Sequence, residues 1–196
     1  SGEPTMYPKL PELIKYLKSL EATKSIFLVT NGQEPDMIQK LQDEDALPTQ
    51  LYLSTNAADY ESFIKINKPK YDDSWERWNR TLDMLKNLDT RTVLRITLIR
   101  DYNDQKEMIP AFADMFRKAS PHFIEIKSYM HIGRSTNRLE HENMLEMHEV
   151  KKFSEQIAKQ SKIFSIMDES LVSRISILQN NERFIDRYIP TYANTN

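Results

Sequence analysis

The chain has 196 residues, 39% of them hydrophobic, with a formal net charge of −2 and no cysteine. This length fits one domain, and the lack of cysteine excludes disulfides, thiolate ligands and a thiol nucleophile within these residues. The balanced charge gives no general attraction to nucleic acid, which leaves only a local basic patch for such binding. The sequence has neither a signal peptide nor an apolar stretch long enough to span a bilayer, so we expect no membrane partner and a cytoplasmic location.

Short apolar runs alternate with helical patterns over the first two thirds of the chain. Apolar residues at helical spacing predict a helix over 10–20, and the compact apolar run 25–30 predicts a buried strand. Further strands are expected at 50–54, 92–99 and 123–129, and further helices near 35–41, 59–66, 73–88 and 105–118. This alternation predicts βαβ units with parallel strands and right-handed crossovers. The expected fold class is α/β, with a layered or barrel-like sheet.

The pattern changes beyond Gly133. Residues 134–142 are strongly polar and predict a long functional loop, which a helix over 145–159 follows. Two short apolar segments, 164–167 and 174–178, flank Asp168-Glu169-Ser170 and predict a terminal pair of strands. We expect residues 191–196 to be a frayed tail.

Ligands of parallel α/β folds bind beyond the carboxyl ends of the strands, and polar residues end the predicted strands here. These strand ends are 30–32, 54–56, 100–101 and 127–129, and Gly2-Glu3 would join them if a strand preceded it. Within the strands, Arg95 and Glu125 are charged, which is costly unless the charges are paired or used. Asn31-Gly32 could equally be a simple turn, and Arg95 could pair with Glu125 as a structural bridge.

The sequence contains no hydrolase triad, phosphate-binding Walker loop or zinc motif. His122, His131, His141 and His148 share no convincing ligand spacing. We therefore predict no metal site made by these residues.

Several segments, read in order, resemble one enzyme family. They are Ser-Gly-Glu-Pro-Thr at 1–5, Thr-Asn-Gly at 30–32, Gln-Leu-Tyr-Leu-Ser at 50–54, Arg-Ile-Thr-Leu-Ile-Arg with Asn at 95–103, and Phe-Ile-Glu-Ile-Lys-Ser-Tyr-Met-His-Ile-Gly at 123–133. Together they resemble the radical S-adenosylmethionine tRNA 4-demethylwyosine synthases. Asp168-Glu169 and Ser173-Arg174 also resemble the C-terminal region of that family.

The resemblance implies a partial (β/α)6 TIM-like barrel, with residues 1–190 as the C-terminal portion of a radical-SAM domain. It implies a lyase of wybutosine biosynthesis that joins 1-methylguanosine of tRNA to a fragment of pyruvate. In the family, a 4Fe-4S cluster, fed by an electron donor, reduces S-adenosylmethionine to a 5′-deoxyadenosyl radical. The family's cluster cysteines and its Schiff-base lysine lie upstream of the Gly-Glu-Pro segment and are absent here, so this chain alone is predicted to be inactive.

The resemblance also assigns cofactor residues. Gly2 and Glu3 match the loop that receives the methionine ammonium group. The candidates for the methionine carboxylate, the ribose hydroxyls and the adenine ring are Asn31, Ser54, Arg95, Thr97, Met130 and His131. Met130 could instead be ordinary core packing. Thr55-Asn56-Ala57 departs from the family, which commonly has an acidic residue before the alanine.

Cations supply the substrate-side candidates. Lys127, Arg134 and Arg174 lie on the matched segments, and Lys127 is the candidate for chemistry. A second possible tRNA surface comprises Lys65, Lys68, Lys70, Arg77 and Arg80, interleaved with Tyr71, Trp75 and Trp78. The alternative for both tryptophans is a packed helix face, and for the lysines a solvated one.

Two rival functions stay open at this point. The chain could be a non-catalytic module of the same fold that binds tRNA or a nucleotide. It could also belong to another radical enzyme that acts on a small molecule. Because no strand precedes Gly2-Glu3 and the barrel lacks its opening βα unit, we expect an open sheet with an unpaired edge on the N-terminal side.

Overall fold

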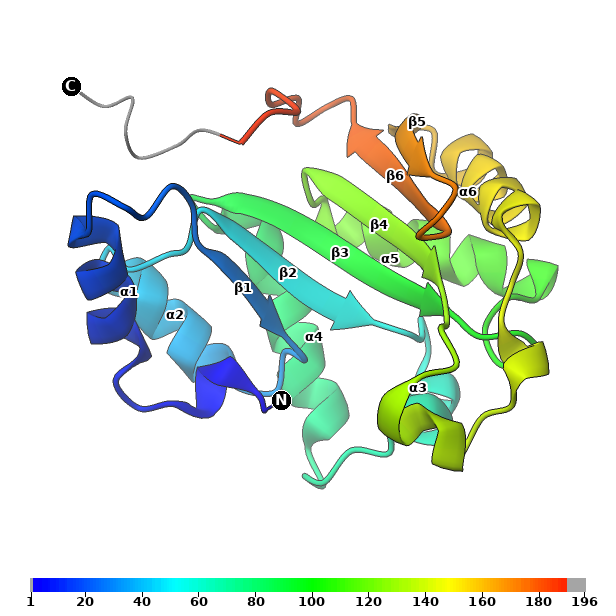
Figure 1. Cartoon of the computed structure of the whole chain (residues 1–196), viewed down its shortest axis with the longest axis horizontal. Coiled ribbons are helices and arrows are strands. Elements are labelled where there is room, and N and C mark those ends of the chain that lie inside the picture. The colour runs from blue at the N-terminus through cyan, green and yellow to red at the C-terminus, as the bar shows by residue number, and fades with distance from the viewer. Residues whose placement is uncertain (1, 190–196) are drawn as a thin grey trace.

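The computed structural model describes residues 2–189, which form one curved six-stranded sheet in the order β1-β2-β3-β4-β6-β5 (Figure 1). Strands β1 to β4 are parallel, and β6 runs antiparallel to both β4 and β5. The strands are β1 (Phe27–Thr30), β2 (Gln50–Thr55), β3 (Arg91–Leu98), β4 (Phe123–Ser128), β5 (Phe164–Ser170) and β6 (Ile175–Asn180). The predicted α/β class, the parallel strands and the C-terminal strand pair are confirmed.

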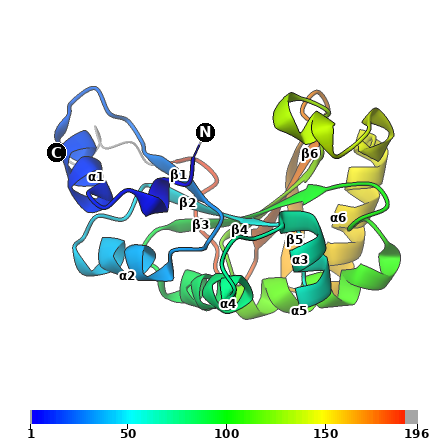
Figure 2. The same cartoon turned by 90° about the horizontal axis from the view of Figure 1, so that it is seen from below.

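One helix precedes β1 and the others connect successive strands, and the helices pack mainly on the convex side of the sheet (Figure 2). They are α1 (Leu10–Ser19), α2 (Pro35–Asp43), α3 (Tyr60–Asn67), α4 (Ser74–Met84), α5 (Ile109–Ala119) and α6 (Met147–Ser161). Their starts follow from local chemistry: Asp59 accepts a hydrogen bond from the Ser62 amide before α3, and Glu146 and Glu149 form a capping box before α6. Short 3-10 turns lie at Pro4–Met6, Leu85–Asn87, Lys106–Met108, Gly133–Asn137 and His141–Asn143.

Alternation along the strands gives the sheet two unlike faces. Leu51, Leu53, Leu94, Ile96, Ile124 and Ile126 are fully buried in the core that the helices cover. The neighbouring positions in each strand face the concave side, which the helices leave open (Figures 1 and 2). Concave-side residues therefore need no apolar character for packing and are free to carry chemistry.

Some predicted boundaries were wrong. Asp168, Glu169 and Ser170 belong to β5, because their backbones pair with β6, and the turn follows at 171–174. The helix expected over 73–88 ends at Met84 and tightens into a 3-10 turn. The loop expected at 134–142 contains two short 3-10 turns. The expected frayed tail at 191–196 lies outside the described residues.

The tryptophans of α4 pack as their alternative interpretation predicted. Trp78 is 1% exposed, stacks on Trp75 with ring centroids 5.4 Å apart, and donates to the Ser54 carbonyl. Gly32 has φ +76°, and a Cβ there would lie 2.6 Å from Leu53 Cδ1. Only glycine therefore fits this turn after β1 without strain.

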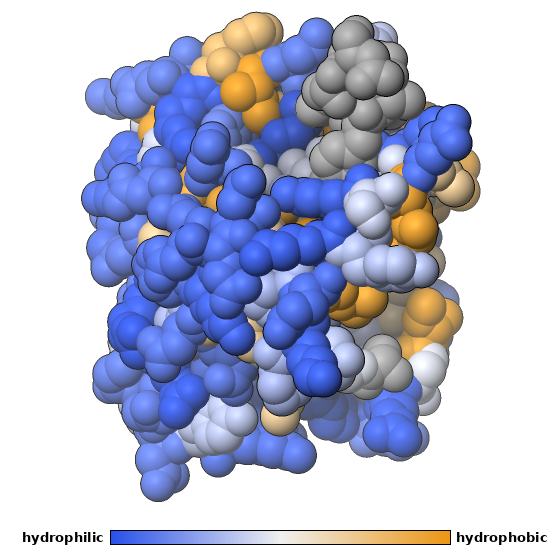
Figure 3. Space-filling model, turned by 90° about the vertical axis from the view of Figure 1, so that its left-hand side faces the viewer, coloured by the Kyte–Doolittle hydropathy of each residue, from blue (hydrophilic) through white to orange (hydrophobic). Residues whose placement is uncertain are grey.

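The surface on the side where α1 lies is predominantly hydrophilic (Figure 3). Ion pairs link its helices, among them Lys15 Nζ of α1 with Glu44 Oε2 at 3.1 Å. Exposed pairs of this kind contribute little to stability. No helix within residues 2–189 has the length and apolar character needed to cross a membrane.

Candidate functional site

The carboxyl ends of β1 and β2 open into a small pocket of about 180 Å³. Asn31 and Ser54, both predicted site residues, line it together with Gln33, Asn56, Phe63, Asn67 and Pro69. Parallel pairing places the two strand ends at one edge of the sheet, where open α/β sheets bind their ligands. The structure therefore brings together residues that lie 23 positions apart in the sequence.

Glu3 lies beside this pocket and organises the end of β1. Its Oε1 accepts from the hydroxyls of Thr5 at 2.6 Å and Thr30 at 2.7 Å, and its Oε2 accepts from the Asn31 amide at 2.7 Å. Gly2 precedes it in open space, since a Cβ at this glycine would have no other atom within 4 Å. The Glu3 carboxylate is thus fixed at the strand ends by several donors.

Two asparagines join the ends of β2 and β3. Asn56 Oδ1 accepts from the Thr97 amide at 3.2 Å, and its Nδ2 donates to Asn67 Oδ1 at 3.2 Å. The fully buried Asn103 donates to the carbonyls of Asn56 at 2.8 Å and Thr97 at 2.9 Å. Asn56 thus supplies neutral hydrogen bonds that link Thr97 to the pocket.

Gln33 provides an unused acceptor at the pocket. Its Nε2 donates to the Ser74 carbonyl at 3.1 Å, whereas its buried Oε1 has no hydrogen-bond partner among the described residues. Leaving a buried acceptor unsatisfied costs about 1–3 kcal/mol. A bound hydroxyl or ammonium group would remove that cost.

Arg95 lies deeper on the concave face, where it is already paired. Its Nε donates to Glu125 Oε1 at 2.8 Å, and its guanidinium stacks over Tyr52 with 4.4 Å between Cζ and the ring centroid. Glu125 is 7% exposed, so this ion pair is largely shielded from water. The structural bridge considered from the sequence is present, and Arg95 is not among the residues that line the pocket with Asn31.

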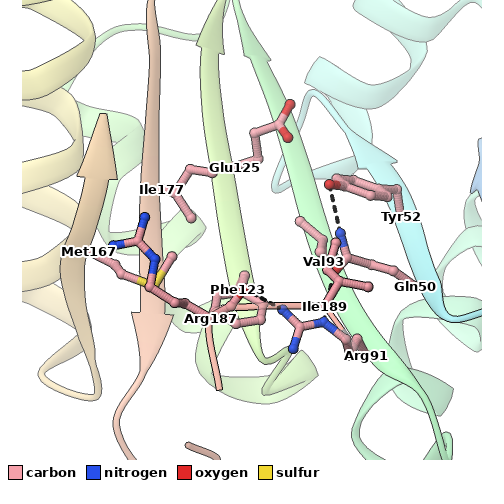
Figure 4. Close-up of a pocket in the computed structure, with 10 residues that line it drawn as sticks. All are labelled: Gln50, Tyr52, Arg91, Val93, Phe123, Glu125, Met167, Ile177, Arg187 and Ile189. Carbon is pink, nitrogen blue, oxygen red and sulfur yellow. Dashed lines mark hydrogen bonds between the residues drawn. The ribbon is translucent and has the colours of Figure 1, made fainter. Parts of the chain in front are cut away.

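A second pocket, of about 170 Å³, lies at the amino-terminal half of the strands (Figure 4). Tyr52, Glu125 and Arg91 line it, and burial, followed by the nearby Glu125 charge, raises the pKa of Tyr52. Arg91 donates to Gln50 Oε1 at 2.9 Å and to the Asp186 carbonyl at 2.6 Å. This arginine therefore ties the C-terminal segment across the lower end of the concave face.

Lys127 lies opposite Thr97 in the register of β3 and β4. Its side chain is half-buried and makes no ion pair or hydrogen bond with the part of the chain that the structure describes. Beyond the strand end, Met130 is 36% exposed, and His131 Nδ1 lies 3.2 Å from the Tyr129 hydroxyl. An unpaired ammonium group thus faces the same side of the sheet as the Arg95–Glu125 pair.

The predicted tRNA cations divide into two groups. Arg77 pairs with Asp73 at 2.9 Å, Arg80 with Asp36 at 2.7 Å, and Arg174 with Glu146 at 3.1 Å. The second group makes no ion pair within residues 2–189 and comprises Lys65, Lys68, Lys70 and Arg134. All four of these side chains are exposed.

Sequence reasoning missed Gln33, Asn103 and Arg138. Gln33 directly follows the Asn31-Gly32 turn, which was the available signal. Asn103 lies in a matched segment without an assigned role, although its position after a strand indicates a strand-end contact. Arg138 lies four residues after Arg134, directly after the 3-10 turn Gly133–Asn137, and this spacing carries no recognisable motif.

Two family models match this chain. Residues 1–113 match the model of the radical SAM superfamily, which is more than half of the chain. The chain therefore belongs to the radical SAM superfamily. Residues 118–180 match a second model, described as wyosine base formation.

The relatives then narrow the family. The chain is 43% identical over 188 residues to the S-adenosyl-L-methionine-dependent tRNA 4-demethylwyosine synthase of Methanocaldococcus jannaschii, covering 95% of this chain and 56% of that protein. The synthase of Pyrococcus abyssi is 37% identical over 182 residues, covering 93% and 52%. Within the superfamily, this chain is similar to the tRNA 4-demethylwyosine synthases. It spans about half the length of these archaeal relatives.

Solved structures agree with this assignment. A structure of TYW1 with a lysine-pyruvate adduct bound superimposes with a TM-score of 0.82 at 42% identity, covering 94% of this chain and 56% of that one. A crystal structure of archaeal TYW1 gives a TM-score of 0.75 at 38% identity, with the same two coverages. The α/β arrangement of this chain is therefore that of a known radical SAM fold.

The superfamily implies S-adenosylmethionine and a 4Fe-4S cluster, and the residues here fit the two differently. The unsatisfied Gln33 Oε1 and the Ser54 hydroxyl at the same pocket suit the polar hydroxyl and ammonium groups of S-adenosylmethionine. The cluster requires thiolate ligands, and the 196 residues contain no cysteine. These residues therefore fit the organic cofactor and do not fit the cluster.

Proposed function

We propose that this chain acts in tRNA hypermodification, as part of a radical-SAM 4-demethylwyosine synthase of wybutosine biosynthesis. The reaction would condense 1-methylguanosine of tRNA with a fragment of pyruvate. The observation that carries the proposal is the 43% identity to the Methanocaldococcus jannaschii synthase, which extends over 95% of the chain and includes both the strand-end pocket and β4. The pyruvate adduct named for a structural neighbour adds support for the small substrate.

In this proposal the strand-end pocket binds and orients the cofactor, which supplies a 5′-deoxyadenosyl radical when it is reduced. Gln33 Oε1 would accept from its polar groups and the Ser54 hydroxyl would accept from or donate to them, while Glu3 holds the end of β1 in place. Met130 and His131 would border the adenine. The assignment of Asn31 and Thr97 to the carboxylate and ribose is part of the same proposal.

Lys127 is our candidate for the reacting side. It is the unpaired cation beside Thr97 on the concave face, and its ammonium group could hold a carboxylate of the substrate fragment. Arg95 is a weaker candidate for that task because Glu125 already occupies its guanidinium at 2.8 Å. We therefore assign Arg95 to positioning of the concave face.

Residues outside these 196 would have to hold the cluster. A separate electron donor would have to reduce it. Because the chain supplies no thiolate, we expect it to be inactive by itself. Anaerobic reconstitution with iron and sulfide should give the 196-residue chain no stoichiometric cluster absorbance.

A chimeric enzyme tests the function directly. The 188-residue segment of the Methanocaldococcus jannaschii synthase that matches this chain would be replaced by the chain itself. The chimera, reconstituted anaerobically, would be incubated with 1-methylguanosine tRNA, pyruvate, S-adenosylmethionine and a reductant. We expect mass spectrometry of the nucleosides to detect 4-demethylwyosine, and we expect Lys127→Ala in the chimera to lower its formation at least tenfold.

The result also separates the rival functions. A folded chimera that carries its cluster and binds tRNA but forms no product would favour the non-catalytic module. A chimera that cleaves S-adenosylmethionine in the presence of a small molecule, and ignores tRNA, would favour the small-molecule enzyme.

A further inference from the structure

The segment after β4 projects an isoleucine into solvent at the carboxyl edge of the sheet. Ile132 is 70% exposed, and Met130 beside it is 36% exposed. One exposed apolar residue is common on protein surfaces and means nothing alone. Here, however, the residue lies on a braced tip and among unpaired cations, and these two features point to a role.

The tip is held by local hydrogen bonds. The Ile132 amide donates to the Met130 carbonyl at 2.8 Å, and the Ser135 hydroxyl donates to the Ile132 carbonyl at 2.7 Å. Gly133 has φ +63° and open space around it, which turns the chain sharply after the isoleucine. The Ile132 side chain is therefore presented by a backbone of defined shape.

The base of the tip is anchored in a small apolar cluster. Tyr129, at 5% exposure, and Leu139, at 8%, lie on either side of the segment and pack with Ile66 of α3 and Ile99. Burying these anchors fixes both ends of the projecting segment. A preorganised tip loses little conformational freedom when it binds a partner.

The same cluster gathers positive charge around the tip. Ile66 of α3 belongs to the same cluster as Tyr129 and Leu139, so the end of α3, with Lys65 and the following Lys68, lies near the segment that carries Arg134 and Arg138. None of these four exposed cations forms an ion pair with the described residues. The Glu140 carboxylate accepts from the Asn143 backbone amide and makes no ion pair with any of the four.

We propose that Ile132 is an apolar wedge that enters the tRNA anticodon loop beside the target guanosine, while Lys65, Lys68, Arg134 and Arg138 hold the flanking phosphates. This inference rests on the proposed function. A base that is modified on its ring must leave the stack to reach a site inside a barrel. Apolar side chains fill the gap that the base leaves, and cations hold the backbone in register.

A single-stranded loop fits this surface better than a duplex. The major groove of an RNA duplex is too narrow for side chains to read, whereas loop bases can be unstacked and covered by a side chain. Arg134 lies two residues beyond Ile132, and Lys65 neighbours Ile66 of the same cluster, so the phosphates that flank one extruded base are the expected contacts. With a net charge of −2, the rest of the molecule adds no general affinity for RNA.

The test uses the 196-residue chain and an anticodon stem-loop RNA that carries 2-aminopurine next to the target guanosine. Unstacking raises the fluorescence of this base analogue. We expect the wild-type chain to raise it at saturation, and Ile132→Ala to lose most of the rise and bind about tenfold more weakly. The matched control is Phe184→Ala, since Phe184 is 72% exposed beyond the opposite end of β6 and should leave both readouts unchanged.

The variant Arg134→Gln separates the effect of a cation on RNA affinity from the effect of Ile132 on base unstacking. It should weaken binding and lower the salt slope by about 0.7, yet keep the fluorescence rise at saturation. The wedge is overturned if Ile132→Ala binds and unstacks the RNA as the wild type does, and the proposed function survives that result. If the wild-type chain does not prefer the anticodon stem-loop over an unrelated one, the wedge fails and the tRNA substrate also loses its support.

Discussion

Arg95 shows how one residue type can serve two tasks that the sequence cannot separate. Its guanidinium is held between Glu125, at 2.8 Å, and the ring of Tyr52. Glu125 is 7% exposed, so removing its partner would leave a shielded carboxylate unpaired. Breaking such a pair costs more than the pair itself contributes.

We therefore predict that Arg95→Ala lowers the free energy of unfolding by about 2–3 kcal/mol. Adding Glu125→Gln should restore part of that loss, because no unpaired charge then remains. Urea denaturation of both single variants and the double variant measures this coupling. Equal stability of Arg95→Ala and the wild type would return Arg95 to the ligand-binding candidates.

His122 makes stability depend on pH. It is buried with Nδ1 3.1 Å from the Thr92 amide, and burial, followed by the charges of Arg183 and Arg91, lowers its pKa to about 4. An unfolded chain binds the proton near pH 6.5, so between these values the unfolded state binds more protons. Stability from this group is therefore complete above pH 6.5 and is lost as the pH falls towards 4.

We expect His122 to account for about 1–2 kcal/mol of the stability lost between pH 7 and pH 4.5. His122→Asn keeps an acceptor for the Thr92 amide but does not titrate, so its unfolding free energy should fall less over this range. Denaturation at several pH values compares the two proteins. Parallel curves would mean that another group causes the acid sensitivity.

At the scale of elements, the cations of α3 and α4 differ in whether they form ion pairs. Lys65 of α3 and Lys68, which caps its C-terminus, have no ion-pair partner in the described part of the chain, although Lys65 lies over the Tyr102 ring at 5.2 Å. Arg77 and Arg80 of α4 are paired with acids. A cation that is already paired gains less from a phosphate, because it must first release its partner.

We predict that Lys68→Ala lowers the salt slope of tRNA binding by about 0.7 to 0.9, whereas Arg80→Ala changes neither slope nor affinity. Filter binding at increasing salt concentrations measures both. Because each substitution removes one exposed cation, the two variants are matched in charge. A larger effect from Arg80→Ala would move the tRNA surface from α3 to α4.

At the scale of the molecule, the central strands of the sheet have neighbours on both sides and the edge strands do not. β3 pairs with β2 and β4, while β1 pairs with β2 and has no other neighbour among the described strands. Phe27 and Val29 of β1 are 49% and 39% exposed on the concave side. Edge strands open more readily than central ones, since fewer contacts must break.

Hydrogen exchange should therefore show β1 amides of the 196-residue chain exchanging at least tenfold faster than β3 amides. In the chimera with the Methanocaldococcus jannaschii synthase, β1 should gain protection if its free edge is covered there. Mass spectrometry of peptides from both proteins provides the comparison. Equal protection of β1 and β3 in the isolated chain would contradict an exposed edge.

The sequence by itself determined the order and kind of nearly all helices and strands, because their apolar periods of 3.6 and 2 are local. It also determined which polar residues end the strands. The resemblance to the synthases rests on ordered segments of the sequence. The sequence placed Asp168 to Ser170 between strands, since β5 reads as polar there and only pairing with β6 reveals it.

Tertiary structure alone decided which polar residues meet and which are already satisfied. Gln33 and Ser54 share a pocket, Arg95 is paired with Glu125, and Arg80 is paired with Asp36, through contacts between residues that are distant in the sequence. The position of the exposed Ile132 near α3 depends on the tertiary cluster that Tyr129 and Leu139 form with Ile66. Local patterns report how each segment folds, whereas partner choice depends on the distances that folding creates between segments.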